Sequence, residues 1–523
     1  MAGTWTGQRP ALVPPRRGAA WLALVPCVAL AAGGCGGGQA ADQGRIGATT
    51  RQAVAPLGDW VRARQAPGTE LMSRQAAGND GKALVDTGIT SVACTARGDC
   101  AASGGYVDAG FNFLVFVTGQ HARKWARAGQ VPGVAALVGN GHAAGSTEMQ
   151  SGPFLSQVSC SSPGNCAIAG NYEVPDSREQ TRPLLSDERA GVWGRAHQIS
   201  GDASAVLAIS CPAAAGDCAA GGFRQTGRIA GEGGGFVVSE NDGVWGRAQP
   251  VPGSMGPVTS MSCPAVGSCL AGGPGYLSGS GFLTPTAGAA FIVSERSGRW
   301  GSARPVPGLG LLTRGKSDVD SVSCVDAGDC AVGGSFVDRS GRAQVFVVDE
   351  RGGVWGQAEP VPGLAALNKG GQAGLTQVSC GSVGNCAAGG WYLNLKGRQR
   401  QQAWVATEVR GRWGLAERVP GTAALNTGGN AAVTSVSCAA ASCVAGGWYA
   451  AGAITRRHSA FLVTERRGSW RTAAQVPGLA ALNTGGYAIM TAVSCAPSGW
   501  CAAVGDYIDG ASGETRMFVV SER

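Results

Sequence analysis

Cysteine is the residue type in this sequence with the widest choice of chemistry, and 16 of the 18 cysteines stand in eight close pairs. A cysteine thiolate can attack a substrate, bind zinc or form a disulfide. The four histidines do not accompany the pairs, and there is no Cys-x-x-Cys, so we predict no metal site and no cofactor. A catalytic nucleophile is needed once rather than in eight paired copies. We therefore predict eight disulfides, namely Cys94–Cys100, Cys160–Cys166, Cys211–Cys218, Cys263–Cys269, Cys324–Cys330, Cys380–Cys386, Cys438–Cys443 and Cys495–Cys501.

Carboxylates could hydrolyse a glycosidic bond if two of them flanked it at a suitable distance. One set recurs at a fixed position of a repeat, which favours a structural role: Glu188, Glu240, Glu295, Glu350, Glu408, Glu465 and Glu522. Unique acids are better catalytic candidates, and they are Asp108, Glu173, Asp176, Asp506 and Asp509. No nucleophile elbow, zinc-protease motif or phosphate loop supports catalysis, so we name no catalytic residue.

Aromatic and amide side chains gather in the last third of the chain and could bind sugar rings by stacking and hydrogen bonding. The candidate binding residues are Trp391, Tyr392, Trp448, Tyr449, Tyr487, Tyr507, Asn368, Asn426 and Asn483. The three asparagines belong to a recurrent Leu-Asn-x-Gly-Gly. An alternative stays open, in which the rings only pack between repeat units and each asparagine bonds its own turn.

The elements that position these residues follow a repeat of about 57 residues, marked by the cysteine pairs. In the unit around Cys380, residues 377–380 and 386–392 read as two short strands separated by a turn. Residues 403–408 read as a third strand, and a fourth begins at Trp413. Four short strands with frequent turn signals and no helical periodicity predict one antiparallel blade of a β-propeller. Small residues dominate the first two strands and large ones the others, as in blades that widen outwards.

The two ends of the repeat array predict a closed ring. The last unit stops after its third strand, at residues 518–523, and lacks the segment with the fourth-strand tryptophan. That segment appears at the N-terminus, in residues 58–63 and 66–68. An N-terminal strand that completes the last blade would remove an exposed sheet edge. We therefore predict an all-β, eight-bladed propeller over residues 56–523.

The N-terminal residues 1–35 read as an export signal. Arg16 and Arg17 precede an apolar stretch that is too short to span a bilayer, and Gly33-Gly34-Cys35 resembles the lipobox of bacterial lipoproteins. The expected lipidation site is Cys35, although an ordinary cleaved signal stays possible because Ala32 replaces the usual leucine. Residues 36–55 read as a flexible linker. Disulfides and an export signal together predict an extracytoplasmic protein, secreted or lipid-anchored to the outer side of the membrane.

Charge gives little support for a nucleic-acid partner. The formal net charge is +8 over 523 residues, and lysines and arginines form no run. We expect a monomer that meets a membrane only through a lipid anchor.

The turn between the third and fourth strands of one unit reads Ser239-Glu240-Asn241-Asp242-Gly243-Val244-Trp245. It resembles the Asp-box of sialidase-type propellers, with Asn241 at the aspartate position and without the threonine. The whole repeat looks like the secreted propellers of actinobacteria with sialidase-like or kelch-like repeats. This resemblance implies the fold, and it implies that the turn is structural and faces away from any active site. The arginine triad and tyrosine nucleophile of sialidases have no counterparts that we can place here, so no activity follows.

If the Asp-box-like turns and the cysteine hairpins share one face, the other loops share the opposite face, where propellers bind ligands. We expect a non-catalytic binding or scaffold protein whose partner is a carbohydrate or another protein. The alternative is a carbohydrate-active hydrolase or lyase with an active site on the same face.

Overall fold

The computed structural model describes residues 60–70, 72, 88–107, 113–138, 155–173, 181–213, 216–225, 233–275, 288–394, 400–440, 442–452 and 457–523. The predicted signal, linker and lipidation site Cys35 lie outside these residues, as do Asp108 and Asp176.

Each of the first four blades consists of three long strands followed by two two-residue strands. Blade 1 contains β2 (Gly88–Ala96), β3 (Asp99–Val107), β4 (Phe113–His121), β5 (Lys124–Trp125) and β6 (Gly129–Gln130). Blade 2 contains β7 (Leu155–Ser162), β8 (Asn165–Glu173), β9 (Thr181–Arg189), β10 (Val192–Trp193) and β11 (His197–Gln198). Blade 3 contains β12 (Ala205–Ser210), β13 (Ala219–Gln225), β14 (Gly233–Asn241), β15 (Val244–Trp245) and β16 (Gln249–Pro250). Blade 4 contains β17 (Ser260–Ala265), β18 (Ser268–Gly275), β19 (Gly288–Arg296), β20 (Arg299–Trp300) and β21 (Arg304–Pro305).

The last four blades repeat this plan, and the eighth is completed from the N-terminus. Blade 5 contains β22 (Thr313–Asp326), β23 (Asp329–Asp338), β24 (Ala343–Arg351), β25 (Val354–Trp355) and β26 (Glu359–Pro360). Blade 6 contains β27 (Ala373–Ser382), β28 (Asn385–Leu393), β29 (Gln401–Val409), β30 (Arg412–Trp413) and β31 (Glu417–Arg418). Blade 7 contains β32 (Ala431–Ala439), β33 (Ser442–Ala450), β34 (His458–Arg466), β35 (Ser469–Trp470) and β36 (Ala474–Gln475). Blade 8 contains β37 (Ala488–Cys495), β38 (Cys501–Ile508), β39 (Thr515–Ser521) and β1 (Arg64–Gln65).

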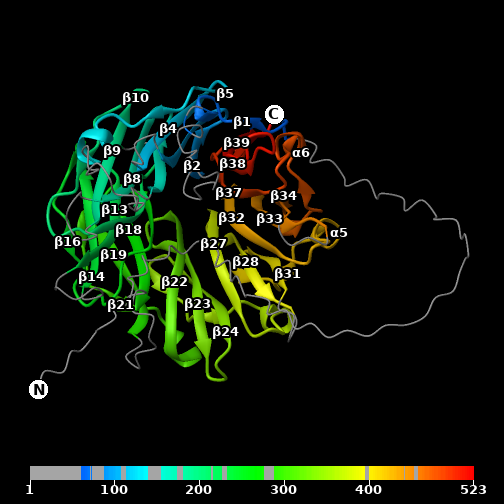
Figure 1. Ribbon diagram of the computed structural model, residues 1–523. Coiled ribbons are helices and arrows are strands. Elements are labelled where there is room, and N and C mark those ends of the chain that lie inside the picture. Colours follow the sequence, from blue (N-terminus) through cyan, green and yellow to red (C-terminus); the bar gives the residue numbers. More distant parts are fainter. Residues whose placement is uncertain are drawn as a thin grey trace, which may run out of the picture.

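The blades form a ring in chain order, and the predicted closure is present (Figure 1). The N-terminal strand β1 pairs antiparallel with β39, with Arg64 opposite Val519 and Gln65 opposite Phe518. Trp60 forms a further bridge to Glu522. The strand that the last repeat lacks therefore comes from the N-terminus, which covers the edge of β39.

An outer belt of backbone hydrogen bonds joins each blade to the next. An alanine N–H after the fourth-strand tryptophan donates to a carbonyl of the link that leaves the preceding blade. The eight donor–acceptor pairs are Ala128–Pro67, Ala196–Pro132, Ala248–Ser200, Ala303–Pro252, Ala358–Pro307, Ala416–Pro362, Ala473–Pro420 and Ala63–Pro477, at 2.7–2.9 Å. The belt includes both junctions of blade 8, so the ring is bonded all the way round.

An inner belt explains the recurrent Ser-Cys pair. The N–H of the first cysteine of a blade donates to the serine hydroxyl of the preceding blade, as from Cys380 to Ser323 at 3.0 Å and from Cys438 to Ser379 at 2.9 Å. All eight predicted disulfides are formed. In six blades the paired cysteines lie opposite each other in neighbouring strands, as Cys94 does to Cys100. Each disulfide therefore fixes a hairpin, and in seven of the eight hairpins the serine before the first cysteine bonds the next blade.

Apolar side chains pack between blades, and glycines in the second strands make room for them. A Cβ atom added to Gly104 would lie 2.5 Å from the ring of Phe116, and one added to Gly447 would lie 2.8 Å from the ring of Phe461. Both rings are fully buried. The glycines of Cys-Ala-Ala-Gly-Gly thus allow a large third-strand ring to lie against the strand next to it.

Short helices in the links between blades were not predicted. They are α2 (Val134–Val138), α3 (Leu309–Leu312), α4 (Leu364–Leu367), α5 (Thr422–Leu425) and α6 (Leu479–Leu482). The glycine before each of α3 to α6 has a φ of 76° to 83°. One turn of helix is too short to show a helical period in the sequence. The first leucine of α4, Leu364, is buried under the link.

Candidate functional site

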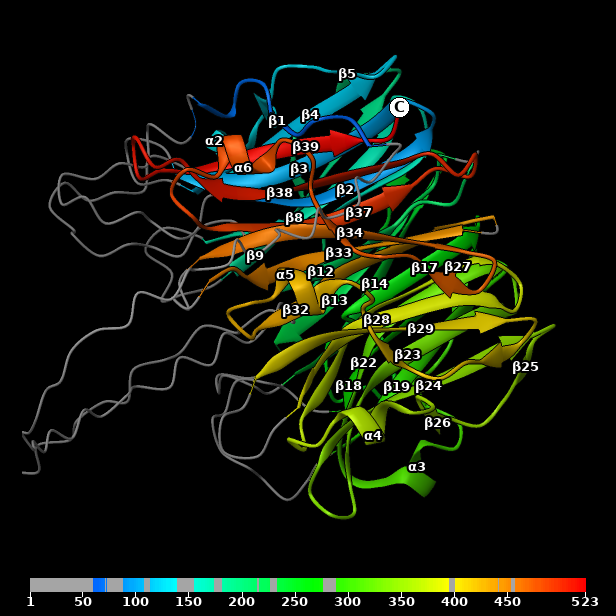
Figure 2. The same ribbon diagram turned by 90° about the vertical axis from the view of Figure 1, so that its right-hand side faces the viewer.

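The two predicted faces of the propeller are both present. The turn between the third and fourth strands donates to the cysteine hairpin of the same blade, as Gly353 N–H does to Gly328 O at 2.9 Å and Gly411 N–H does to Gly384 O at 2.8 Å. These turns define the bottom face. The loops between second and third strands and the links between blades define the top face. In Figure 2, β25 lies at one end of the blades, away from α5 and α6.

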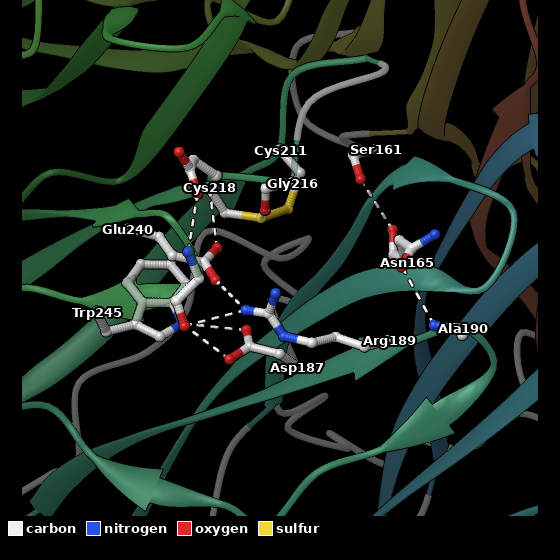
Figure 3. Close-up of polar contacts among 12 residues, drawn as sticks. Ser161, Asn165, Asp187, Arg189, Ala190, Cys211, Gly216, Cys218, Glu240 and Trp245 are labelled. Carbon is white, nitrogen blue, oxygen red and sulfur yellow. Dashed lines mark hydrogen bonds and ion pairs between the residues drawn. A yellow bond between two sulfur atoms is a disulfide. The ribbon is translucent and has the colours of Figure 1, made fainter.

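The bottom face carries a cluster of charged groups between blades 2 and 3 (Figure 3). Glu240 is buried, and Arg189 of the preceding blade donates to its Oε1 at 2.7 Å. The N–H of Cys218 donates to its Oε2 at 3.0 Å. The indole Nε1 of Trp245 donates to both oxygens of Asp187, at 3.0 and 3.1 Å. Burial, together with the charge of Asp187, raises the pKa of Glu240 to about 7.

A second cluster of the same kind lies between blades 5 and 6. Arg351 bridges Glu408 and Asp349. Trp413 Nε1 donates to Asp349 Oδ2 at 3.2 Å. Burial and the charge of Asp349 raise the pKa of Glu408 to about 7, and the two carboxyl groups share a hydrogen bond. A glutamate at the repeat position, an arginine and a tryptophan thus tie two neighbouring blades together.

The space at these clusters admits water rather than a sugar. The cavity beside Glu240 measures about 30 Å³ and the one beside Glu408 about 10 Å³. One water molecule needs about 10–15 Å³ measured in this way, whereas ligand pockets measure hundreds. The carboxylates of these two clusters therefore act as connections between blades, as their recurrence in the sequence suggested.

The aromatic candidates differ in exposure on the top face. Tyr392, Tyr449 and Tyr507 are 3–5% exposed, and Trp448 is 6% exposed. The tyrosines pack in the cores beneath the links that enter their blades. Trp391 and Tyr487 are half-buried, so part of each residue is accessible.

Trp391 lies across the inner strand of its own blade. A Cβ atom added to Gly374 would lie 2.9 Å from Trp391 Nε1, so this glycine leaves room for the indole. Tyr487 follows the link helix α6 and forms one end of a ring stack. Its ring lies 5.0 Å from His458, whose ring lies 4.7 Å from that of Trp448.

The three asparagine candidates bond the third strand of the preceding blade. The Nδ2 of Asn368 donates to Ala343 O at 2.9 Å, and that of Asn483 donates to His458 O at 3.0 Å. Asn426 Nδ2 donates to Gln402 Oε1 at 3.5 Å. Asn368 and Asn426 are buried, and Asn483 is half-buried. The amide nitrogens thus hold the links in place.

Among the unique acids, Asp506 occupies a junction between blades. Its Oδ1 accepts the N–H of Ile89 in blade 1 at 2.9 Å. Asn171 stands at the same position of blade 2, and its side chain bonds both the N–H and the carbonyl of Val206, at 2.7 and 2.8 Å. Burial raises the pKa of Asp506 to about 8. The Asp506 carboxyl group is therefore part of the contact between blades 8 and 1 that closes the ring.

Asp509 is held in an exposed turn by Ala511 N–H and by Arg516, at 3.1 Å each. Glu173 ends β8, and its side chain lies outside the described residues.

Sequence reasoning missed two acids, Asp318 and Asp320, in the inner strand β22 of blade 5. Ser335 Oγ donates to Asp320 Oδ2 at 2.6 Å. Burial and the charge of Asp318 raise the pKa of Asp320 to about 8. Asp320 is the extra residue of a bulge, where blades 6 and 7 have Thr376 and Thr434. The alignment of the repeats around this bulge was the signal that could have found it.

Within the described residues, no group of three or more histidines, cysteines or acids is arranged to hold a metal ion. The same part of the chain contains no helix long and apolar enough to cross a membrane.

Comparisons with known proteins give distant structural likenesses. No protein-family model matches the sequence, and no curated protein matches it. A Hadza microbial sialidase shares 11% identity at a TM-score of 0.35, over 85% of this chain and 67% of its own. An ulvan lyase of polysaccharide lyase family 25 shares 10% identity at 0.38, over 76% and 95%. The propeller domain of the Trilobed protease from Pyrococcus furiosus shares 9% identity at 0.39, over 75% and 97%. These likenesses are too weak to support an activity. The chain forms a disulfide-bonded eight-bladed β-propeller.

Proposed function

We propose that this protein is a non-catalytic binding or scaffold propeller of the cell envelope, and that its top face at blades 5 to 8 binds a carbohydrate. The eight disulfides support an oxidising compartment. The lipobox-like Cys35 supports a lipid anchor on the outer side of the membrane. The sequence features shared with secreted actinobacterial propellers agree with this location.

The observation that carries the proposal is a contrast between the two faces. On the bottom face, the carboxylates beside Glu240 and Glu408 are bonded between blades around cavities of about 30 and 10 Å³. On the top face, Trp391 on β28 and Tyr487 directly before β37 are half-buried, so part of each residue is accessible. An accessible ring on a fixed backbone suits stacking against a sugar.

A glycan array tests this proposal with the exported full chain and with the double variant Trp391→Ala, Tyr487→Ala. The matched control is Val244→Ala, Val354→Ala, which trims two exposed apolar side chains from bottom-face turns. We expect the wild type and the control to bind the same glycans and the double variant to lose about tenfold in affinity. Absence of glycan binding by the wild type, or an equal loss in the control, would contradict the proposal.

A carbohydrate-active hydrolase or lyase is the second candidate, and one observation favours it. Asp320, whose pKa is raised to about 8, and Asp318 lie together in one blade of eight, as a catalytic site would. The test is turnover of polysaccharides that bind the array. An enzyme would lose turnover in Asp320→Asn while retaining binding, and unchanged substrates with the wild type would exclude this candidate for those polysaccharides.

A further inference from the structure

Three arginines occupy the same position on the top face of consecutive blades. Arg342, Arg400 and Arg457 directly precede the third strands β24, β29 and β34. In blade 8, Glu514 stands at this position, directly before β39. The arginine row is therefore confined to blades 5 to 7 among the last four blades.

Each of these arginines lies over the second glycine of a Leu-Asn-x-Gly-Gly link. A Cβ atom added to Gly371 would lie 3.6 Å from Arg342 Nε. One added to Gly429 would lie 2.5 Å from Arg400 Nη1, and one added to Gly486 would lie 3.3 Å from Arg457 Cγ.

The conformation of these glycines agrees with that contact. Their φ angles are 80°, 93° and 81° for Gly371, Gly429 and Gly486, in the left-handed region. The second glycine of each motif thus turns the chain, and at Gly429 the missing side chain also leaves room for the Arg400 guanidinium. At Arg342 a hydrogen bond from the guanidinium to Asn368 O restricts the side chain before any ligand arrives, which lowers the entropy lost on binding.

The row is exposed and carries little opposing charge. Arg400 and Arg457 are exposed, and Arg342 is half-buried with a hydrogen bond from its guanidinium to Asn368 O. Lys369 is exposed in the link next to Arg342. Within residues 338–342, 368–372, 426–430 and 483–487, Asp338 is the one acid. Asp509 lies 3.5 Å from Thr484 Oγ1 in the link at Arg457, and its charge is paired with Arg516 at 3.1 Å.

The charge of Asp338 is already engaged in its own turn. Its Oδ1 accepts the Ser340 N–H at 2.9 Å and the Arg342 N–H at 3.0 Å, and its Oδ2 accepts from Gln344 at 3.2 Å. The surface formed by Arg342, Lys369, Arg400 and Arg457, here called the arginine arc, therefore has a net positive charge.

We infer that the arginine arc binds an extended acidic polysaccharide that carries a carboxylate on successive sugars; this inference rests on the proposed carbohydrate binding by the top face. A guanidinium donates two parallel hydrogen bonds to a carboxylate, which makes arginine suited to uronic acids. A row of like groups on three successive blades fits a polymer better than a small anion. Trp391, on β28 of the middle blade, supplies a ring against which a sugar can stack.

Polygalacturonate and its fully methyl-esterified form are the probes, because they share the sugar and differ in charge. The binding variant is Arg342→Gln, Arg400→Gln, Arg457→Gln in the full chain. The control, Lys124→Gln, Arg299→Gln, Arg412→Gln, removes three exposed charges from bottom-face turns at one repeat position. Thermal melting of each variant checks folding, and Arg400→Glu alone serves if the triple variant melts early.

We expect the wild type to bind polygalacturonate about tenfold more tightly than the ester, to lose that preference in the triple variant, and to keep it in the control. Equal affinity for acid and ester, or equal losses in both triple variants, would overturn the inference. Equally tight binding of duplex DNA would also overturn it, because the arc would then attract any polyanion. If only neutral glycans bound, the inferred role of the arginine arc would be wrong and the proposed carbohydrate binding would stand. If no glycan bound, both would be wrong.

Discussion

The backbone N–H of Cys94 donates to the hydroxyl of Ser494 at 2.9 Å, although 400 residues separate the two in the sequence. The same bond joins Cys211 to Ser159, Cys263 to Ser210, Cys324 to Ser262 and Cys495 to Ser437. A serine hydroxyl thus accepts the same hydrogen bond at the closing junction between blades 8 and 1 as at the junctions within the chain. The junction between blades 1 and 2 differs, because Ala93 stands at the serine position there.

This inner belt predicts opposite effects of two substitutions. Ser323→Ala removes the acceptor for Cys380 N–H and should lower the free energy of unfolding by about 1 kcal/mol. Ala93→Ser adds an acceptor for Cys160 N–H and should raise it, by less than about 1 kcal/mol. Denaturant unfolding of both variants measures the effects. If Ser323→Ala left the free energy of unfolding unchanged or raised it, the bond from Cys380 N–H to Ser323 would not stabilise the protein.

Ring closure predicts a strong dependence on the N-terminal strand. Deleting residues 56–68 removes Trp60 and β1, exposes the edge of β39 and breaks the belt at Ala63 and Ala128. We expect the melting temperature to fall by about 10 °C or more and aggregation to increase. Differential scanning calorimetry measures this, with deletion of residues 36–48 as the control. Unchanged melting after the first deletion would mean that the ring does not depend on this strand.

The buried carboxyls predict that stability falls between about pH 5 and pH 8. Folding raises the pKa of Glu240 and Glu408 from 4.5 to about 7, so the folded state binds more protons than the unfolded state between those values. Their contribution is greatest below pH 4.5 and is lost as the pH rises through 7. Asp320 and Asp506, raised from 3.8 to about 8, extend the loss to higher pH.

Melting temperatures from pH 5 to pH 9 check this dependence for the wild type and Glu408→Gln. The glutamine cannot ionise, so the variant should lose less stability than the wild type as the pH rises. A wild type that gains stability over this range would contradict the assignment of these carboxyls.

Asp506 and Asn171 predict a reciprocal pair of substitutions. Asp506→Asn should supply both bonds that Asn171 makes to the neighbouring blade and remove a carboxyl that ionises near pH 8. We expect Asp506→Asn to stabilise the protein at pH 9 by about 1 kcal/mol, and Asn171→Asp to destabilise it there. Chemical denaturation at pH 5 and pH 9 separates ionisation from packing. An effect of Asp506→Asn that is the same at both pH values would rule out ionisation as its cause.

The sequence was sufficient to predict the ring, because the repeat and its closure can both be recognised from sequence features alone. The paired cysteines repeat eight times, and the orphan segment with Trp60 matches what the unit ending at Arg523 lacks. Burial at the candidate site was harder to foresee. Alternation along β28 shows that Trp391 and Tyr392 point to opposite sides, but not that the tyrosine side is covered by a link while the tryptophan side is partly open.

The inner acids were hidden for a related reason. Asp318 and Asp320 lie in a polar run that reads as a loop, and an alignment with the inner strands of blades 6 and 7 is needed to place Asp320 at the bulge. The arginine arc was missed because its three arginines lie outside the recurrent Leu-Asn-x-Gly-Gly motif that they contact. Contacts between a third strand and the following link bring them together only in the folded chain.

Hydrogen–deuterium exchange of the full chain, with and without its tightest glycan from the array, tests the central claim that the top face of blades 5 to 8 is the binding surface. We expect slower exchange on binding in residues 338–343, 368–374 and 426–432, with no change in the bottom-face turns 351–355 and 409–413. Protection of those bottom-face turns, or no protection at the top face under saturating glycan, would contradict it.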